Sequence, residues 1–368
     1  MTILAAAALL AWLWLALLHG HFWQRGPCLP RARPRAAPPV AIIVPARDEA
    51  ATVGPVVASL LAQDYEGPFR VILVDDNSTD ATAALARAVA DPQGRLTVLT
   101  GAARPEGWAG KLWAVHQGTL ASAEDLVFLT DADIVHAPSH LATLVAGMES
   151  TGAAMVSEMV ALRCASLAER ALVPAFVYFF AMLYPFSRVN TPRSPVAAAA
   201  GGSVLLRRDV LGRVGGIAAI KGALIDDVAL ARAVKRHAPI WLGHTGEARS
   251  IRPYPHFADM WRMIARSAYV QLRHSPVRLV GCVLGMAVLF LMPVVSLFLG
   301  MNLFYATWFL MSGTFLPALA RAGRSGFWVL ALPLIALFYV AATIGAAIDH
   351  HRGRGVIWKN RAYPGVHP

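Results

Sequence analysis

The sequence predicts an α/β domain that is built on a mostly parallel sheet and attached to membrane helices. Three observations predict it. Short apolar runs alternate with helical patterns over residues 38–165, acidic residues follow several of these runs, and long uncharged stretches lie near both ends of the chain. Hydrophobic residues make up 57% of the 368 residues and charged residues 15%, against about 25% charged in a typical soluble domain. This composition argues against a plain soluble globule and excludes intrinsic disorder.

The first apolar run, residues 3–19, has roughly the length of one bilayer crossing. It is followed by four arginines in a proline-rich stretch: Arg25, Arg31, Arg33 and Arg35. A cleaved signal peptide has its positive charge before the apolar run and a small-residue cleavage site after it. We therefore predict that residues 1–22 are an uncleaved transmembrane anchor and that the following domain lies in the cytoplasm.

A second apolar region covers residues 279–348. No charged residue or histidine occurs from Leu279 to Ala320, which allows two spans joined by a turn near residues 300–302, and a third run covers residues 327–348. A basic tail, residues 349–368, follows. Three crossings from a cytoplasmic domain would place this tail outside, against the positive-inside rule. Either one run is re-entrant or interfacial or the rule does not hold, so the number and parity of crossings stay open.

Between these regions, residues 38–275 are predicted to form the catalytic domain. Four apolar runs indicate strands: residues 40–44, 71–74, 96–99 and 126–129. A βαβ rhythm of this kind places ligands at the carboxyl ends of the strands. Acidic clusters follow the first, second and fourth runs, at residues 47–49, 75–77 and 131–133. We therefore expect a ligand site at this edge of the sheet.

Several enzyme classes lack their motifs in this sequence. No GxGxxG follows the first strand and no GxxxxGK[ST] occurs, which excludes dinucleotide-binding dehydrogenases and P-loop enzymes. Serine hydrolases fit poorly because no GxSxG occurs at a strand end. The three cysteines show neither metal-ligand spacing nor a disulfide framework. The net charge of +11 resides in arginines beside apolar segments, so lipid headgroups explain it better than a nucleic acid does.

The acidic clusters suggest particular chemistry. Asp131 and Asp133 flank one alanine and can converge on Mg²⁺ or Mn²⁺ and on a diphosphate that the ion bridges, although such residues also cap helices. Asp226 and Asp227 begin a helical segment, where acids favour the helix dipole. Asp227 is alternatively a general base.

Two further motifs have both a functional and a structural interpretation. Lys111 opens a helix in GWAGKLWAVHQG, where it could meet a phosphate or simply be solvated. Asp75 and Asp76 lie in VDDNSTD, in which helix capping would explain Asp80 but not both of the earlier acids.

Five of these motifs carry a resemblance to a known family. In order along the chain they are VPARDEA (Val44–Ala50), VDDNSTDAT (Val74–Thr82), LTDADI (Leu129–Ile134), GGSVLLRR (Gly201–Arg208) and IDDVALA (Ile225–Ala231). Their order resembles that of family 2 glycosyltransferases of GT-A fold, a Rossmann-like nucleotide-diphospho-sugar transferase domain. More narrowly, GWAGKLWAVHQG, the Ser250–Leu272 stretch and WKNRAYP (Trp358–Pro364) resemble the bacterial hopene-associated glycosyltransferases of hopanoid biosynthesis.

The resemblance implies roles for individual residues. Pro45 and Glu49 would line the nucleoside site, and Asp75 or Asp76 would contact the base or ribose. The same resemblance gives Asp131 and Asp133 the divalent cation and the donor diphosphate. Asp227 would be the base of an inverting displacement, beside Asp226, and Lys111 would neutralise the departing nucleoside diphosphate.

The chain departs from the family in one motif. Processive synthases and ceramide glucosyltransferases of this superfamily carry QxxRW after the base motif, and no Arg-Trp pair occurs here. The matching region, residues 256–273, is expected to be an interfacial helix. There Arg266 and Gln271 could contact acceptor or diphosphate, or the helix could bind lipid headgroups. A second stretch, residues 171–186, is predicted to be interfacial or re-entrant, with an ordinary buried helix as the alternative.

Together these patterns lead to one expected function. It is a metal-dependent, inverting, single-sugar transfer from a nucleotide-sugar, expected to be a UDP-sugar, to a lipid hydroxyl, with a hopanoid acceptor implied by the resemblance. Polyprenyl phosphate, a carotenoid or diacylglycerol are alternative acceptors, and a catalytically silent membrane scaffold is the alternative of another class. We expect a multi-pass protein of the bacterial inner membrane whose catalytic domain faces the cytoplasm. The sugar, the oligomeric state and any pathway partners are not specified by the sequence.

Overall fold

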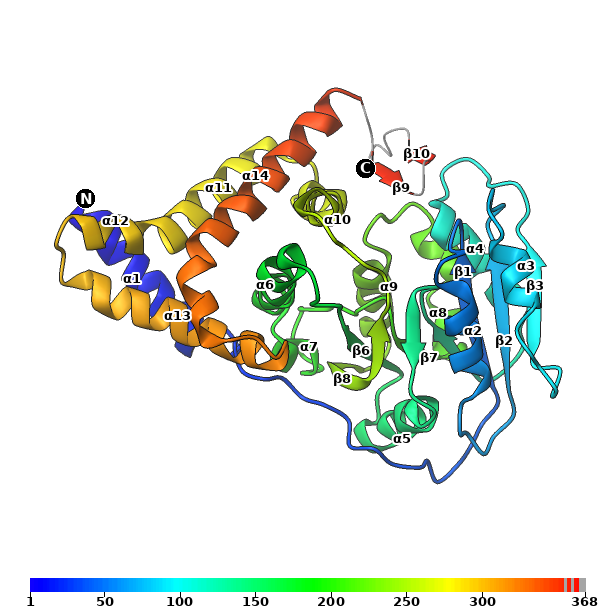
Figure 1. Ribbon diagram of the computed structural model, residues 1–368. Coiled ribbons are helices and arrows are strands. Elements are labelled where there is room, and N and C mark those ends of the chain that lie inside the picture. The colour runs from blue at the N-terminus through cyan, green and yellow to red at the C-terminus, as the bar shows by residue number, and fades with distance from the viewer. Residues whose placement is uncertain (354–355, 359–360, 364–368) are drawn as a thin grey trace. The chain divides into compact units, whose positions relative to one another are not determined.

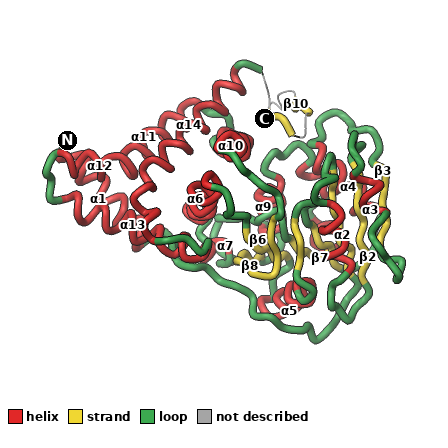
Figure 2. Tube along the Cα trace, viewed as in Figure 1, coloured by secondary structure: helices red, strands yellow, loops and turns green. Residues whose placement is uncertain are grey.

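The computed structural model describes residues 1–353, 356–358 and 361–363. The chain divides into two compact units, shown in Figures 1 and 2. We call residues 27–163 and 188–252 the sheet unit, and residues 1–26, 164–187 and 253–368 the helical unit. Both segments expected to be interfacial helices fall in the helical unit.

The sheet unit contains one eight-stranded sheet among its described residues. The strands are β1 (Val40–Ala46), β2 (Phe69–Asp75), β3 (Leu96–Thr100), β4 (Leu126–Leu129), β5 (Ile134–His136), β6 (Met155–Ala161), β7 (Val204–Arg207) and β8 (Ile240–Ser250). They lie across the sheet in the order β3-β2-β1-β4-β7-β6-β8-β5. The four strands predicted from apolar runs are β1 to β4 and are confirmed.

The sheet is parallel in one half and mixed in the other. Strands β3, β2, β1 and β4 pair in parallel, whereas β7 is antiparallel to both β4 and β6, and β5 is antiparallel to β8. Strands β6 and β8 are again parallel. The expectation of a mostly parallel sheet thus holds for β3, β2, β1 and β4, whereas β7 and β5 run antiparallel to their neighbours.

Helices cover both faces of this sheet. The helices of the sheet unit are α2 (Val53–Leu61), α3 (Thr82–Arg87), α4 (Gly110–Leu120), α5 (His140–Thr151), α8 (Arg208–Arg213), η1 (Ile217–Ile220) and α9 (Asp226–Lys235). Alternate β1 residues, such as Ile42 and Val44, pack in one core cluster with α2 and α5. On the opposite face α4 comes so close that a Cβ at Gly118 would lie 2.5 Å from the side chain of Ile43. Residue alternation along β1 therefore builds two cores, one on each face.

The loops that follow β1 and β2 are tied together at the carboxyl edge of the sheet. Asp48 and Asn77 have left-handed backbones, with φ of 50° and 54°. The Asp48 carboxylate accepts the Thr79 amide N–H at 2.7 Å, and the Glu49 amide donates to the Thr82 hydroxyl at 2.7 Å. Left-handed non-glycine residues cost free energy and gather at functional sites, and these two lie where the sequence predicts the nucleoside site.

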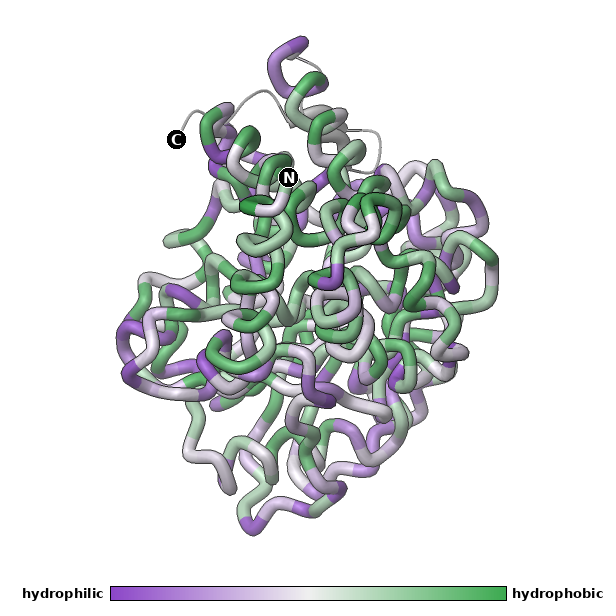
Figure 3. Tube along the Cα trace, turned by 90° about the vertical axis from the view of Figure 1, so that its left-hand side faces the viewer, coloured by the Kyte–Doolittle hydropathy of each residue, from purple (hydrophilic) through white to green (hydrophobic). Residues whose placement is uncertain are grey.

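The helical unit consists mostly of apolar helices (Figure 3), while α10 (Phe257–Gln271) is amphipathic. Its helices are α1 (Thr2–Leu17), α6 (Leu167–Leu183), α10, α11 (Pro276–Met286), η2 (Ala287–Leu291), α12 (Met292–Phe298), α13 (Leu303–Arg321), η3 (Gly326–Ala331) and α14 (Leu332–His351). A two-stranded ribbon, β9 (Val356–Trp358) with β10 (Arg361–Tyr363), follows, and the short α7 (Phe186–Val189) lies at the boundary of the units.

Three helical segments of the described chain are long and apolar enough to cross a membrane. They are Pro276–Phe298, Leu303–Arg321 and Gly326–His351, and they confirm the three apolar segments expected in the C-terminal region. The 16-residue α1 is shorter than these, about 24 Å at 1.5 Å per residue, so an N-terminal membrane anchor stays a prediction. So does the parity of the crossings. Several tail residues, including Arg354, Lys359 and Pro364, lie outside the described residues.

Helix α6 has the character of a core helix within the helical unit. The Tyr178 side chain is 2% exposed and its hydroxyl is 2.9 Å from the Thr314 hydroxyl of α13. The Tyr339 hydroxyl of α14 donates to the Leu172 carbonyl at 2.9 Å. These contacts agree with the buried-helix alternative for residues 171–186, and an interfacial position for this helix stays a prediction.

Candidate active site

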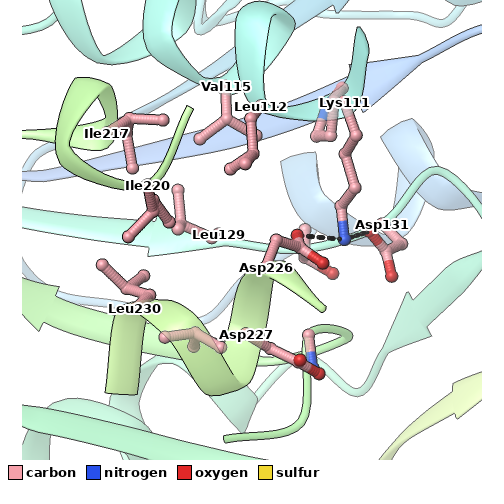
Figure 4. Close-up of a pocket in the computed structure, with 14 residues that line it drawn as sticks. Lys111, Leu112, Val115, Leu129, Asp131, Ile217, Ile220, Asp226, Asp227 and Leu230 are labelled. Atoms are coloured by element: carbon pink, nitrogen blue, oxygen red, sulfur yellow. Dashed lines mark hydrogen bonds and ion pairs between the residues drawn. The ribbon is translucent and has the colours of Figure 1, made fainter. Parts of the chain in front are cut away.

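A pocket of the sheet unit collects residues from five of the sequence motifs (Figure 4). Charged groups lie on one side of it, supplied by α4, the end of β4 and the start of α9. Aliphatic side chains form the remaining wall. Its lining residues are Pro45, Lys111, Leu112, Val115, Leu129, Thr130, Asp131, Gly201, Val204, Ile217, Ile220, Asp226, Asp227 and Leu230.

Lys111 bridges two of the predicted acidic residues. It lies in the first turn of α4, and its Nζ is 2.9 Å from Asp131 Oδ1 and 3.0 Å from Asp226 Oδ2. Figure 4 shows the lysine pointing between the two carboxylates. The helix carrying it is anchored because the Ala109 amide donates to the Lys221 carbonyl at 2.7 Å. The solvated-lysine alternative therefore does not describe this side chain in the structure.

The pocket carries an excess of negative charge. Burial lowers the pKa of the Lys111 ammonium, but the attraction of Asp131 and Asp226 outweighs burial and raises that pKa overall. Burial raises the pKa of Asp131, and repulsion from Asp133 and Asp226 adds to the rise against the opposing effect of Lys111. One lysine thus faces several carboxylates, which is an arrangement that additional positive charge would stabilise.

Asp227 is held by backbone amides. The Gly201 amide donates to Asp227 Oδ2 at 3.0 Å, and the Val228 amide donates to Oδ1 at 2.7 Å. Burial, followed by repulsion from Asp226, raises the pKa of Asp227 to about 7 despite these hydrogen bonds. A carboxylate with a pKa near neutral pH, fixed in a pocket, has the properties of a general base.

Asp133 and Glu49 share one arginine that the sequence analysis did not identify. Arg252 Nε lies 2.9 Å from Asp133 Oδ2, and its Nη2 contacts Glu49 Oε1. The Ser250 hydroxyl also donates to Asp133 Oδ2, at 3.1 Å. Glu49 is 8% exposed. Arg252 therefore links a predicted nucleoside residue to a predicted metal residue.

The remaining predicted nucleoside residues lie at the ends of β1 and β2. Pro45 lines the pocket and pairs with Val74 in the parallel ladder. Asp75 ends β2 and accepts the Ser78 amide at 3.2 Å. Asp76 is 1% exposed, with a carboxylate oxygen 3.9 Å from the buried Arg47 guanidinium.

Two predicted residues lie in the helical unit. Arg266 and Gln271 are both on α10, and the Gln271 amide donates to the Tyr184 hydroxyl. Their roles toward acceptor or diphosphate stay predictions. Within the sheet unit, the pocket unites Pro45, Lys111 and the aspartates at 131, 226 and 227, while Asp133 and Glu49 are joined through Arg252.

Sequence reasoning missed three groups at this site. They are the Arg252 guanidinium, the Ser250 hydroxyl and the Gly201 amide. Each reaches its carboxylate from more than 25 positions away along the chain: Gly201 is 26 residues from Asp227 and Arg252 is 119 residues from Asp133. The only signal was that all three lie in stretches quoted for the family resemblance.

The carboxylate ligands at this site fit a hard divalent cation that arrives together with the diphosphate of a nucleotide-sugar. Asp131 and Asp133 offer the carboxylate oxygens that Mg²⁺ and Mn²⁺ prefer. In the part of the chain that the structure describes, no group of three or more His, Cys, Asp or Glu side chains is placed to hold a metal ion alone. Mg²⁺ commonly takes one or two carboxylates and completes its shell with phosphates and water, so two carboxylates suffice when a donor is present.

The sequence of this unit matches a known family. Residues 41–215 match the model of "Glycosyl transferase family 2", which includes β1 to β7. A solved structure shows the fold: the mannosyltransferase PcManGT from Pyrobaculum calidifontis, in complex with GDP-Man and Mn²⁺, has a TM-score of 0.56. It is 18% identical, with 95% of this chain and 98% of that chain covered. The GT-A fold predicted from the sequence is confirmed.

Three curated relatives match shorter segments. The β-monoglucosyldiacylglycerol synthase of Synechocystis is 29% identical over 35% of this chain and 32% of its own length. The 4,4'-diaponeurosporenoate glycosyltransferase of Staphylococcus aureus is 34% identical over 25% and 23%. The succinoglycan biosynthesis protein ExoU of Rhizobium meliloti is 37% identical over 29% of each chain. The matches thus span a third or less of each of these relatives.

Proposed function

We propose that this chain, whose residues 41–215 match the family 2 glycosyltransferase model, moves one sugar from a nucleotide-sugar to the hydroxyl group of a membrane lipid. The observation that carries the proposal is the pocket in which Asp227, Lys111 and Asp131 meet beside an aliphatic wall. A single-displacement transfer requires a general base, here Asp227, and groups that stabilise the leaving diphosphate, here the Lys111 ammonium and a metal-binding carboxylate such as Asp131.

The mechanism follows from these groups. The acceptor oxygen attacks the anomeric carbon while the bond from that carbon to the donor phosphate breaks, and its electron pair leaves with the nucleoside diphosphate. Asp227 Oδ takes the hydroxyl proton, and its raised pKa makes it a stronger base than an ordinary aspartate. The Lys111 ammonium stabilises the charge that develops on the departing diphosphate. One displacement inverts the configuration at the anomeric carbon.

A divalent cation would be held by Asp131 and Asp133 with the donor phosphates. When bound, it would neutralise charge on the leaving diphosphate. The residues themselves supply the rest: Arg252 orients Asp133 through the 2.9 Å contact, and the strand-end residues at β1 and β2 hold the nucleoside. The cation requirement is testable by chelation, and full turnover after rigorous treatment with EDTA would contradict it.

The acceptor is inferred from the wall of the pocket. Leu112, Val115, Ile217, Ile220 and Leu230 place hydrocarbon on the side away from the charged groups. An apolar lining is common to ligand pockets and is compatible with an acceptor whose hydroxyl is attached to an apolar body. The names of two relatives, a diacylglycerol glucoside synthase and a diaponeurosporenoate glycosyltransferase, support a lipid acceptor. A hopanoid is the specific acceptor that the sequence resemblance implies.

Membrane association follows from the helical unit. Three segments long and apolar enough to span a bilayer would hold the enzyme where lipid acceptors are. We propose the bacterial inner membrane with the sheet unit facing the cytoplasm, where nucleotide-sugars are made. A catalytically silent scaffold is the alternative. The pairing of Lys111 with Asp131 and Asp226, close to Asp227, argues against it.

The test is lipid labelling in membranes that contain the wild-type protein. Radiolabelled UDP-sugars, with GDP-mannose in parallel, are supplied with Mg²⁺ or Mn²⁺, and label is counted in the organic extract before and after mild acid. Label that resists acid indicates a glycoside on a lipid hydroxyl and supports the proposal. Acid-labile label would identify a polyprenyl-phosphate acceptor instead. Absence of label from every donor would contradict the proposed transfer.

A further inference from the structure

A buried chain of hydrogen bonds leads away from the pocket into the sheet unit. We call it the histidine relay; its members are Thr130, His136, His140 and Glu158. All four are 5% exposed or less. Thr130 Oγ1 is 2.9 Å from His136 Nε2, the two Nδ1 atoms of His136 and His140 are 2.8 Å apart, and His140 Nε2 is 2.8 Å from Glu158 Oε2.

The direction of donation in the relay is fixed at its pocket end. The Thr130 hydroxyl donates its single proton to the Gly202 carbonyl at 2.8 Å, because a carbonyl can only accept. Thr130 Oγ1 must then accept from the Nε2–H of His136. Burial, followed by repulsion from His140, lowers the pKa of His136, which keeps this ring neutral and its Nδ1 bare. His140 therefore donates from Nδ1, and one proton is shared between its Nε2 and Glu158.

Packing leaves these rings little freedom. The two imidazoles are nearly coplanar, with an interplanar angle of 16° and ring centroids 5.0 Å apart, and the Phe128 ring meets both of them edge-on, at 5.4 and 5.9 Å. The members come from different elements: Thr130 follows β4, His136 ends β5, His140 begins α5 and Glu158 lies in β6. A buried polar network that is fully satisfied rigidifies its surroundings, whereas a partly satisfied one is costly.

The relay ends on the backbone that holds the proposed base. Gly202 accepts from Thr130, and its neighbour Gly201 donates to Asp227 Oδ2 at 3.0 Å. Strand β6 is hydrogen-bonded to the same segment. The Ser157 hydroxyl accepts the Ala200 amide N–H at 2.8 Å, and the Glu158 amide donates to the Ser203 carbonyl at 3.0 Å. Thr130 is also the residue directly before Asp131. Thr130 thus joins both halves of the site, through its hydroxyl to the Gly202 carbonyl and through its backbone to Asp131.

We propose that the histidine relay is a positioning device, which fixes the Gly201–Gly202 backbone, and with it Asp227, relative to Asp131. The inference rests on the proposed function, because those two aspartates are assigned to the acceptor and donor sides of one displacement. The relay reaches the pocket lining through Thr130 alone among its members. It acts by holding the base at the distance that in-line attack requires.

Two variants at Glu158 test the hydrogen bonding. Glu158→Gln keeps a side-chain N–H that can donate to His140 Nε2 and preserves every donation downstream, whereas Glu158→Leu removes the partner. We expect Glu158→Leu to lower kcat about 10- to 100-fold, the scale of a misplaced reacting group, with the donor KM changed less than about threefold. Glu158→Gln should keep kcat within about threefold of wild type.

A control separates positioning from loss of stability. Val145, on the same helix as His140 and 2% exposed, makes no hydrogen bond through its side chain. Val145→Ala should lower Tm as a core cavity does and leave kcat unchanged at temperatures where the protein is folded. Unchanged kcat in Glu158→Leu would overturn the proposal. So would equal losses in the Gln and Leu variants, which would indicate that charge or proton transfer is needed instead.

A readout that does not depend on activity keeps this inference separable from the proposed function. In ¹⁵N-histidine spectra of the full chain in detergent, His136 should be the Nε2–H tautomer and His140 should carry a proton on Nδ1, with assignments from single histidine variants. The opposite tautomer of His136 would overturn the relay even if sugar transfer is observed. If no lipid is labelled, slow release of UDP from UDP-sugar to water supplies the kcat comparison.

Discussion

The side-chain contacts that join structural elements differ between the two units. In the sheet unit, charged side chains face one another across the pocket, as Lys111 does with Asp131 and Asp226. In the helical unit, the buried contacts described above are neutral, between the Tyr178 and Thr314 hydroxyls and from the Tyr339 hydroxyl to a backbone carbonyl. Moving a charged side chain into a low-dielectric medium costs free energy unless the charge is paired or hydrogen-bonded, and charges kept there often mark functional sites. The comparison therefore predicts large losses of activity from changes in the first unit and small losses of stability from changes in the second.

The largest effect is expected at the proposed base. Asp227→Asn keeps the shape of the side chain and removes its ability to take a proton, so kcat should fall about 10²- to 10⁴-fold, the contribution of a general base. Steady-state transfer by the purified protein measures it. Asp209→Asn is the matched control, because Asp209 is on α8 and its carboxylate is 56% exposed. Activity retained in Asp227→Asn would remove this residue as the base.

Replacing the pocket lysine should have the next largest effect. Lys111→Met removes the positive charge that we propose to face the departing diphosphate, so kcat/KM should fall about 10²- to 10³-fold. Lys235→Met is the comparison, since Lys235 Nζ donates to the backbone carbonyls of Val189 and Val196, both at 2.6 Å, outside the pocket. It should lower Tm and leave kcat near wild type. Equal losses of activity in both variants would mean that Lys111 is merely structural.

A double-mutant cycle can test the arginine bridge. Arg252→Gln and Glu49→Gln should each raise the donor KM about tenfold, and the double variant should raise it no more than either alone, because residues in one ion-pair network are not additive. Donor titrations at saturating acceptor give the KM values. Fully additive effects would show that the contact between Arg252 and Glu49 does not position the donor site.

The pH profile should show the perturbed base. Because the pKa of Asp227 is raised to about 7, kcat/KM should rise with pH through about 7 as the carboxyl group loses its proton. Asp226→Asn removes the like charge that is the second cause of this rise, so its acidic limb should move to lower pH. A limb at pH 4, or one that stays in place in Asp226→Asn, would contradict the assignment.

The smallest effect is expected in the helical unit. Tyr178→Phe removes one buried hydrogen bond to Thr314, worth about 1 kcal/mol of the free energy of unfolding. Thermal unfolding in detergent should show a Tm lower by a few degrees, with kcat within about twofold of wild type. A large loss of activity at unchanged Tm would place Tyr178 in acceptor binding and break the contrast between the units.

Much of the sheet unit could be predicted from local sequence. Strands β1 to β4 were visible because fully buried strands form continuous apolar runs bounded by polar loops. The sequence predicted a ligand site where acids that follow such strands meet at one edge of the sheet, and Asp131 is the member of those acidic clusters that lines the pocket. Strand β5 was missed because its three residues are too few to show a period. Arg252 and the histidine relay depend on contacts between distant segments, which no local pattern encodes.

The sequence analysis assigned the base to Asp227, but the surroundings of the two neighbouring aspartates lay beyond the sequence. Asp226 and Asp227 are consecutive at the start of α9, so their side chains point about 100° apart around the helix. Only the structure shows that Asp226 reaches Lys111 while Asp227 is held by the Gly201 amide. Arg266 and Gln271, on a helix of the other unit, stay predictions.

The configuration of the product tests the central claim most directly. An α-linked donor such as UDP-glucose should give a β-linked lipid glycoside if Asp227 activates the acceptor for one displacement. The anomeric proton coupling constant in the NMR spectrum of the purified product distinguishes the two configurations. A β-glycoside made by wild type and lost in Asp227→Asn is the result that we predict. An α-glycoside would contradict the single displacement and the role of Asp227 as its base.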